Sequence, residues 1–211
     1  MKTVVVDFDD FQDRWDRNGL DILFYWKSKF PNFKVNLFTV PYKTSANFLK
    51  LIMPHLDWIN LCIHGFAHES NFEVQYWNEE LTNKYLDYAE TFDVYSKVFK
   101  APGWQITYPQ PYNENPNPSK PVNSNPQLVY NILKDRGYVV ADQCYNKSKR
   151  PEGLSVYCTC NPMMVHGHTW DMLQGEPNGL EQMERAGVLW DTDTKFKFIT
   201  ELTEEELKCR Y

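Results

Sequence analysis

Histidine is the residue type whose placement most strongly suggests chemistry, because four of the five histidines lie in two close pairs. His64 and His68 are spaced HxxxH, and His166 and His168 flank a single glycine. Imidazole is the commonest protein ligand for metals and an acid–base group near neutral pH. Gly65 stands where an HExxH metalloprotease carries glutamate, so the sequence excludes that class. The first pair could bind a metal ion. The second pair follows an apolar run and would join the same site, and the alternative is that one of its rings packs in the core while the other is exposed.

Acidic residues follow the first apolar run of the chain, which contains three consecutive valines. Asp9 and Asp10 are adjacent there, and adjacent side chains of a strand point in different directions. One carboxylate can therefore bind a metal ion while the other exchanges a proton with water. Lys100 and Asp142 follow two later apolar runs in the same way. A metal-dependent acid–base site is one interpretation of these residues, and for the aspartate pair a solvated acidic turn or a helix N-terminus is the other.

Residues so far apart in the chain need a scaffold that brings them together, and the hydrophobic pattern predicts one. Short β-branched runs alternate with helical segments of roughly 10–15 residues, which is typical of βαβ units and a mainly parallel sheet. We expect strands at 3–8, 34–40, 58–63, 94–99, 138–141, 155–160 and 163–166, and helices at 14–29, 44–51, 76–89, 125–135 and 180–186. The polar residues then follow strands, at the carboxyl ends where α/β barrels and open sheets place their sites. At 211 residues the predicted (β/α) barrel is small or incomplete.

One segment departs from this alternation. Residues 108–126 contain six of the 13 prolines and five asparagines, so they form neither a helix nor a central strand. A long loop inside a compact domain is often functional, and this one follows a strand. We expect it either to flank the substrate or to be a solvated loop or linker.

The order of these motifs resembles that of the polysaccharide deacetylase (NodB-homology) family over about residues 3–170. Residues 7–11 (Asp-Phe-Asp-Asp-Phe) resemble the family's Thr-Phe-Asp-Asp-Gly, and residues 64–68 are similar to its His-Ser/Thr-x-x-His. Residues 99–104 resemble the third motif, which usually has arginine where this chain has Lys100. Residues 138–142 and 165–168 resemble the fourth and the last motifs.

The resemblance implies an α/β fold, a distorted or incomplete (β/α) barrel of the polysaccharide deacetylase type, formed by residues 1–211 as a single catalytic domain. It also implies metal-dependent removal of an N-acetyl group from an N-acetylated sugar or glycan. Asp10, His64 and His68 would hold a divalent metal ion, usually zinc. Two neutral imidazoles and one carboxylate leave positions open for water and a carbonyl oxygen.

The same resemblance implies roles in proton transfer. Asp9 would be the general base, supported by Lys100 and Asp142. Either His166 or His168 would protonate the departing amine. The Thr-Trp that follows His168 can wall a sugar pocket, which favours His168 slightly.

Four further positions would contact the substrate, namely Pro102, Gly103, Trp104 and Trp170. The N–H near Gly103 would stabilise an oxyanion. The chain differs from the family pattern at three positions, with Phe11 for glycine, Lys100 for arginine and Gly65 for a hydroxyl residue. Lysine offers a flexible point charge in place of the planar arginine fork.

Two alternatives remain open. Another amide hydrolase, such as a deformylase or a ring-opening amidase, would use the same scaffold. A catalytically silent carbohydrate-binding module would instead stack a sugar on Trp77, Trp104 or Trp170. A non-haem iron oxygenase would also use two histidines and a carboxylate, but its usual HxD…H order is absent.

Composition further narrows the classes of protein to which the chain could belong. The net charge of −6 and the pI near 5.4 do not suggest a nucleic-acid partner. No apolar stretch approaches the roughly 18 residues of a membrane span. No secretory signal is evident, so we expect a cytoplasmic protein, the alternative being a mature fragment whose signal was removed. The five cysteines are odd in number and irregularly spaced, so we expect them to be reduced and buried, with Cys158 and Cys160 in the core. The sequence predicts no particular oligomeric state.

Overall fold

The structure is a computed structural model, and it describes residues 3–12, 16–70, 72–106, 126–168, 190–191 and 193–207. The proline-rich segment expected to flank the substrate lies outside these residues, apart from Pro126, and so does the helix expected at 180–186.

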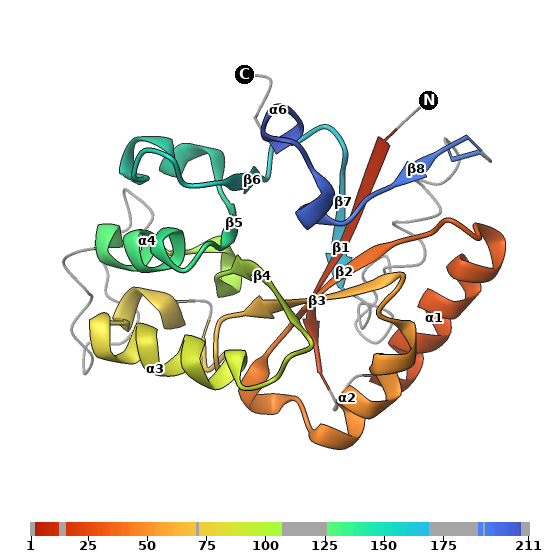
Figure 1. Ribbon diagram of the computed structural model, residues 1–211, viewed down its shortest axis with the longest axis horizontal. Coiled ribbons are helices and arrows are strands. Elements are labelled where there is room, and N and C mark those ends of the chain that lie inside the picture. The colour runs from red at the N-terminus through yellow and green to blue at the C-terminus, as the bar shows by residue number, and fades with distance from the viewer. Residues whose placement is uncertain are drawn as a thin grey trace.

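The described residues form one parallel sheet with helices on its outer side (Figure 1). The strands are β1 (Thr3–Phe11), β2 (Val35–Thr39), β3 (Ile59–His64), β4 (Tyr95–Lys100), β5 (Val139–Asp142), β6 (Val156–Cys158), β7 (Met164–His168) and β8 (Lys195–Phe196). Seven strands follow one another in the order β6-β5-β4-β3-β2-β1-β7, and β8 pairs with the start of β1. No ladder joins β6 to β7 in the described part of the chain, so the prediction of an incomplete (β/α) barrel is confirmed.

The outer layer consists of α1 (Asp16–Lys29), α2 (Ala46–Ile52), α3 (Glu79–Glu90) and α4 (Pro126–Asp135), and a short α6 (Glu204–Leu207) ends the described chain. Local signals define where two of these helices begin. The Ser45 hydroxyl accepts the N–H of Phe48 at 3.1 Å, and Asn78 Oδ1 accepts the N–H of Leu81 at 2.8 Å. Both caps satisfy a backbone donor that the first helical turn leaves unpaired.

Successive side chains of β1 point alternately to the outer and the inner face of the sheet, which are two different environments. Val4, Val6 and Phe8 belong to an apolar cluster that includes the buried residues of α1 and α2. Val5 belongs to a different cluster on the inner face. Because side chains of a strand alternate, Asp7 shares the inner face with Val5. Apolar side chains therefore fill the amino end of the inner face, and polar ones follow toward the carboxyl end.

A C-terminal segment that the sequence pattern did not predict closes the amino end of the inner face. It contains β8, the 3₁₀ helix η7 (Ile199–Glu201) and α6. Buried Asn36 fixes this segment, because its Oδ1 accepts the N–H of Ile199 at 3.0 Å and its amide donates to the Val6 carbonyl at 3.1 Å. The site must therefore open at the opposite, carboxyl end of the strands.

The expectation of reduced cysteines is wrong for two of the five. Cys144 and Cys160 form a disulfide, while Cys62 and Cys158 are buried thiols. β6 ends at Cys158, so Cys160 lies in the following turn and is not a core residue of the strand.

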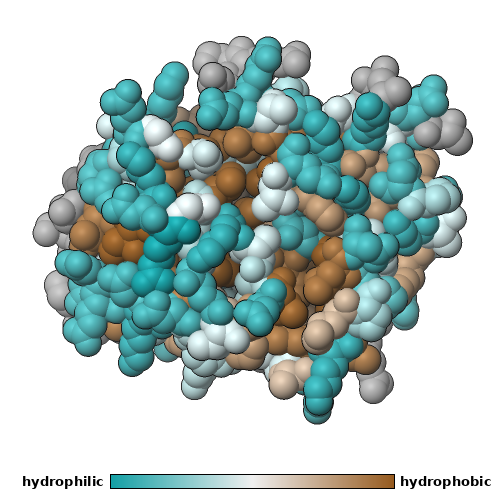
Figure 2. Space-filling model, in the orientation of Figure 1, coloured by the Kyte–Doolittle hydropathy of each residue, from teal (hydrophilic) through white to brown (hydrophobic). Residues whose placement is uncertain are grey.

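The surface shows hydrophilic side chains over most of the face in view, with apolar side chains visible between them (Figure 2). Among the described residues, the structure contains no helix with the length and apolar character needed to cross a membrane.

Replacing Asn36 by alanine tests the attachment of the C-terminal segment. Asn36→Ala leaves the buried N–H of Ile199 without an acceptor, so we expect a loss of about 1–3 kcal/mol in the free energy of unfolding. Urea denaturation measures this change. Asn47→Ala, at an exposed position of α2, is the control and should change stability by less than about 0.5 kcal/mol. Equal effects of the two substitutions would contradict the role given to Asn36.

Candidate active site

The two adjacent aspartates diverge because β1 is irregular where they lie. Phe8 pairs with Leu37 of β2 and Phe11 pairs with Thr39, so β1 carries one more residue than its neighbour between the two pairs. Asp10 has a φ of 58°, a conformation that non-glycine residues adopt at a cost. A bulge of this kind re-aims a side chain. It turns Asp10 toward His64 and His68, while Asp9 stays on the inner face.

Asp10, His64 and His68 bring three potential ligand atoms together. Asp10 Oδ1 lies 3.4 Å from His64 Nε2 and 3.1 Å from His68 Nε2, and it is buried without a hydrogen bond. An acceptor oxygen left unsatisfied beside two imidazole nitrogens is an arrangement that a bound cation would satisfy. The donor set of two nitrogens and one oxygen suits a divalent transition metal.

The protonation of His64 favours the same use. Its Nδ1–H donates to the Lys100 carbonyl at 3.2 Å, which leaves Nε2 unprotonated and facing Asp10. Burial lowers the pKa of His64 to about 4, so the ring is neutral at pH 7. In proteins, a metal-binding imidazole is commonly oriented by such a hydrogen bond from its other ring nitrogen to a carbonyl. Burial also lowers the pKa of His68, but contact with Asp10 raises it more, and the pKa ends above its usual value.

The segment from His64 to His68 is a loop, so the two histidines meet without the helix that would place i and i+4 on one face. Positive φ values at Gly65 (61°) and His68 (47°) make the turn. The Glu73 carboxylate accepts the backbone N–H groups of Phe66 at 2.6 Å and Ala67 at 3.2 Å. The loop is therefore fixed by an anion that holds its backbone donors.

Lys100 lies at the centre of the inner face with its side chain fully buried. Its Nζ lies 2.6 Å from Asp7 Oδ1 and 2.7 Å from Asp9 Oδ1. The same atom lies 3.9 Å from the ring centroids of both Phe38 and Trp104. Two carboxylates and two aromatic faces thus surround one cation.

This cation controls the charge of Asp9. Burial raises the pKa of Asp9, but Lys100, His64 and His166 lower it more, and the carboxyl is held well below its usual range. Asp9 is therefore an anion at neutral pH. Its Oδ2 lies 3.9 Å from His64 Nε2 and 3.7 Å from His166 Nε2, beyond hydrogen-bond distance of either ring.

The second histidine pair lies beside the aspartates because β7 pairs with β1. The parallel register sets His166 opposite Asp7 and His168 opposite Asp9. The Nδ1–H of His166 donates to Asp7 Oδ1 at 2.7 Å, and His168 Nε2 lies 3.6 Å from Asp10 Oδ2. Burial and Lys100 lower the pKa of His166, but Asp9 and Asp7 raise it more, so the net shift is upward.

Asp142 is not part of this group. Its Oδ2 accepts the Tyr130 hydroxyl at 2.7 Å and the Arg150 Nε–H at 3.0 Å, and its Oδ1 accepts the Asn146 amide at 2.9 Å. Its catalytic role stays a prediction, but its contacts are those of a buried carboxylate that holds the surrounding structure together.

The four residues predicted to contact the substrate differ in their surroundings. Pro102 packs on Gly65, and Gly103 has a φ of 60°. Trp104 is buried, at 8% exposure, and its ring lies 5.2 Å from that of His166, so it packs inside the site. Trp170 lies outside the described residues. Trp77 is also buried, which leaves the binding-module alternative without an exposed ring among the described tryptophans that it named.

Two residues that the motif comparison did not assign now have clear contacts. Asp7 joins Lys100 to His166, and Glu73 holds the loop between the first two histidines. The alternation of side-chain direction along a strand could have placed Asp7 in the site, because Asp7 lies two residues before Asp9 and therefore shares its face. No sequence signal distinguishes Glu73 from other surface acids.

A carboxylate–histidine site at the carboxyl ends of the strands of an incomplete (β/α) barrel is the arrangement that the sequence resemblance led us to expect. No protein-family model and no curated protein matches the sequence. Solved structures do match. A family 4 acetyl xylan esterase from Clostridium thermocellum, solved with a cobalt ion, is 15% identical with a TM-score of 0.49, covering 95% of this chain and 89% of that chain.

Two further structures give a similar result. A family 4 carbohydrate esterase from Streptomyces lividans, in complex with acetate, is 12% identical with a TM-score of 0.48 and covers 88% of this chain and 90% of that one. A deacetylase solved with substrate is 12% identical with a TM-score of 0.46, covering 98% and 90%. At these identities the likeness concerns the fold alone.

Gly65→Ala tests the loop that joins the metal-site histidines. A Cβ there would lie 2.8 Å from Cγ and Cδ of Pro102, at a φ that disfavours side chains. We expect a loss of about 1–3 kcal/mol in unfolding free energy and weaker zinc binding by titration calorimetry. Gly137→Ala is the matched control, because its φ is 75° but nothing lies within 4 Å of its Cβ position. Equal zinc affinity in the two variants would contradict the prediction.

Lys100→Met tests the buried cation. It leaves Asp7 and Asp9 buried without their partner, so we expect a loss of about 3–5 kcal/mol at pH 7 in urea denaturation. The loss should shrink at pH 4.5, because carboxyls without the cation have a higher pKa and become neutral as the pH falls.

Two further variants control the Lys100 experiment. Lys97→Met removes an exposed ion pair of the same strand, with Glu90 at 2.5 Å, and should cost less than about 1 kcal/mol. Adding Asp7→Asn to Lys100→Met should restore part of the lost stability. A loss that is the same at both pH values would show that the packing of Lys100, and not its charge, is what matters.

Proposed function

We propose that the chain is a metal-dependent hydrolase that removes an acetyl group from the nitrogen of an N-acetylated sugar or glycan. The observation that carries this proposal is the pairing of two groups on either side of Asp9. On one side is the buried Asp10 oxygen with two imidazole nitrogens. On the other is His166, held by a buried carboxylate.

Asp10, His64 and His68 would hold the divalent ion, for which zinc is our proposal. When bound, such an ion polarises a carbonyl oxygen and makes a water molecule more acidic. This chain's residues supply the remainder: Asp10 brings the charge, and His64 is fixed in the required tautomer by the Lys100 carbonyl.

Asp9 would accept a proton from the attacking water at Oδ2. Its other oxygen is held by Lys100 at 2.7 Å, so the carboxylate cannot rotate freely. A carboxylate whose pKa is well below its usual range is a weak base, and it therefore works only on a water that has been made more acidic. This dependence links the role of Asp9 to the adjacent metal site.

His166 would protonate the departing nitrogen from Nε2. Its Nδ1–H is engaged by Asp7, which orients the ring and favours its protonated form. An amine is a poor leaving group unless it is protonated, so a histidine held in this way suits an amide more than an ester. The products are then acetate and a free amine, with one water consumed. The same reasoning favours His166 over His168 as the acid.

The experiment is an assay for released acetate on N-acetylglucosamine oligomers, with and without metal chelator, read alongside zinc content by atomic emission. Asp10→Ala should lose the zinc and the activity, because two neutral imidazoles hold a dication poorly. Asp57→Ala, at an exposed acid, is the control.

Several outcomes would count against this function. Zinc content that is undiminished in Asp10→Ala would refute the ligand assignment. Release of formate from N-formyl compounds, or ring opening of cyclic amides, in place of acetate would favour the other amide hydrolases. Faster release from O-acetylated than from N-acetylated sugars would make the chain an esterase.

His166→Ala and His168→Ala test the acid. Turnover needs protonated His166, so it should fall as the pH rises through a pKa above the ordinary 6.5. His166→Ala should abolish this alkaline limb and lower the rate about 10²–10⁴-fold. His168→Ala should cost about tenfold and keep the limb.

A third variant tests the partner of the acid. Asp7→Asn removes one of the carboxylates that raise the pKa of His166, so the alkaline limb should move to lower pH. His55→Ala, remote from the site in an edge-to-face contact with Phe24, is the control. All rates are compared at equal zinc occupancy. An alkaline limb that disappears with His168 and persists without His166 would reverse the assignment.

A further inference from the structure

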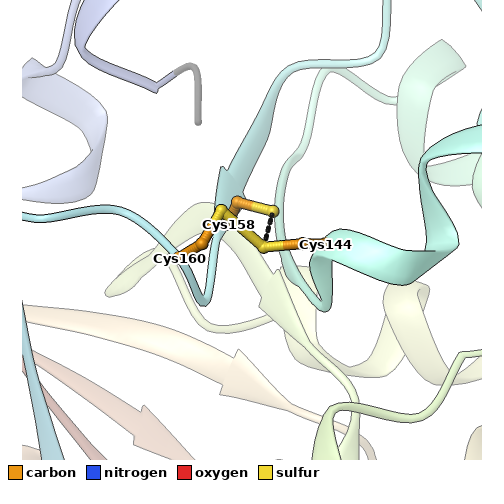
Figure 3. A group of neighbouring side chains, drawn as sticks. All are labelled: Cys144, Cys158 and Cys160. Atoms are coloured by element: carbon orange, nitrogen blue, oxygen red, sulfur yellow. Dashed lines mark hydrogen bonds between the residues drawn. A yellow bond between two sulfur atoms is a disulfide. The ribbon is translucent and has the colours of Figure 1, made fainter. Parts of the chain in front are cut away.

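Three cysteine sulfurs meet at the edge of the sheet, outside the candidate active site. Cys144 begins the 3₁₀ helix η5 (Cys144–Lys149), Cys158 ends β6, and Cys160 lies in the following turn (Figure 3). Cys144 and Cys160 form a disulfide, and Cys158 Sγ lies 3.0 Å from Cys144 Sγ. All three sulfurs lie within 4.8 Å of one another. The Cys158 thiol therefore contacts the Cys144–Cys160 disulfide and could take the place of one of its two cysteines.

We propose that Cys144, Cys158 and Cys160 form a thiol–disulfide exchange site in which Cys158 and Cys160 compete for the bond to Cys144. The Cys158 thiolate attacks Cys144 Sγ, so that the Cys144–Cys158 bond forms while the Cys144–Cys160 bond breaks. Cys160 leaves as a thiolate and takes up the proton that Cys158 lost. The number of disulfides does not change, so this step needs neither an oxidant nor a reductant.

The sheet register explains why two cysteines reach the same partner. β5 and β6 pair with Asp142 opposite Cys158, and Cys144 follows Asp142 by two residues. The Thr159 N–H donates to the Asp142 carbonyl at 3.1 Å, which folds the turn back toward η5 and brings Cys160 with it. Reacting atoms about 3–3.5 Å apart are already close to the geometry of attack. The backbone therefore holds Cys158 at that distance from Cys144 without further movement.

A positive charge lies beside the attacking sulfur. Arg150 Nη2 is 3.9 Å from Cys158 Sγ, and Arg150 Nε donates to Asp142 at 3.0 Å. The thiolate is the form that attacks a disulfide, and the Arg150 guanidinium lies where it would contact that anion. Asp142, which the motif comparison placed with the catalytic residues, thus pairs with Arg150 next to the cysteines.

The cluster can be reached by small molecules. A cavity of about 700 Å³ is lined by all three cysteines together with Arg150 and Lys147. This is the size range of pockets for small ligands. A low-molecular-weight thiol entering it could attack the disulfide, forming a mixed disulfide with one cysteine and releasing the other as a thiolate. Small thiols and disulfides are therefore the chemical class that we assign to this site.

The experiment identifies which cysteines are joined. Full-length protein is reduced in the presence of a metal chelator, reoxidised with hydroxyethyl disulfide at pH 8, quenched with acid and alkylated with N-ethylmaleimide. Trypsin cleaves after Lys147 and Lys149, which separates Cys144 from the peptide that contains Cys158 and Cys160. Fragment-ion mass spectrometry of that peptide then shows which of its two cysteines carries the alkyl group.

We expect two isomers in the wild type, with the alkyl group on Cys158 in one and on Cys160 in the other. Their ratio should re-equilibrate after either isomer is enriched, and more slowly at pH 5 than at pH 8, because exchange requires a thiolate. A single isomer, alkylated at Cys158 at every time and pH, would overturn the proposal and leave an ordinary structural disulfide.

Single variants supply an independent measurement. Cys160→Ser should still form a disulfide, now Cys144–Cys158, and Cys158→Ser should form Cys144–Cys160. Each oxidised variant should then show two thiols per chain on titration with Ellman's reagent in denaturant. Four thiols in oxidised Cys160→Ser would overturn the proposal, because Cys158 would not replace Cys160.

A control and a competing outcome complete the design. Cys62→Ala removes a thiol buried in β3, whose sulfur lies 3.6 Å from the Ser96 hydroxyl, and should leave both isomers in place. Reduced wild-type protein that holds one zinc ion through the three cysteines and resists reoxidation would overturn the proposal in favour of a thiolate metal site. The acetate assay is not used, so failure of the proposed hydrolase function would not affect these results.

Discussion

The ion pair between Lys100 and the carboxylates of Asp7 and Asp9 is the constraint on which the rest of the inner face depends. Three charged groups are buried there, and each would be costly in an apolar interior without the others. β4 supplies the cation and β1 supplies both anions, although β2 and β3 lie between them in the sheet. Their contact therefore requires the sheet to curve. Phe38 and Trp104 then exclude water from Lys100 Nζ, and His166 takes the remaining position on Asp7 Oδ1.

Backbone strain is concentrated around this ion pair. In the described part of the chain, the non-glycine residues with positive φ are Asp10, His68 and Trp104. Each such residue costs about 1–3 kcal/mol and persists only where the surroundings enforce it. Here the enforcement comes from the bulge in β1, from Glu73 and from the turn after β4. Two of these three residues belong to the proposed metal site, which is consistent with strain that is retained because it aims ligand atoms.

The two halves of the parallel sheet carry different chemistry. β1, β3, β4 and β7 bring the carboxylates, histidines and Lys100 to one place. β5 and β6 instead carry Asp142, Arg150 and the cysteines, which are tied together by their own hydrogen bonds. Tyr130 of α4 also bonds Asp142, and burial together with Asp142 raises the pKa of its hydroxyl, so this end of the sheet holds its buried anion with neutral and cationic donors. One scaffold thus separates a proposed hydrolytic site from a proposed thiol site.

The sequence by itself determined the alternation of strands and helices and the set of residues that gather at one end of the barrel. These depend on local periodicity and on residue type, which hydrophobic patterns report directly. Only the tertiary structure decided that Asp7 partners His166, that Asp142 partners Arg150, and that Cys144 bonds Cys160. Those pairings depend on strand register and on a one-residue bulge, which join residues up to 159 positions apart. A shift of one residue in register reverses which side chains share a face, so no local pattern in the sequence specifies such partners.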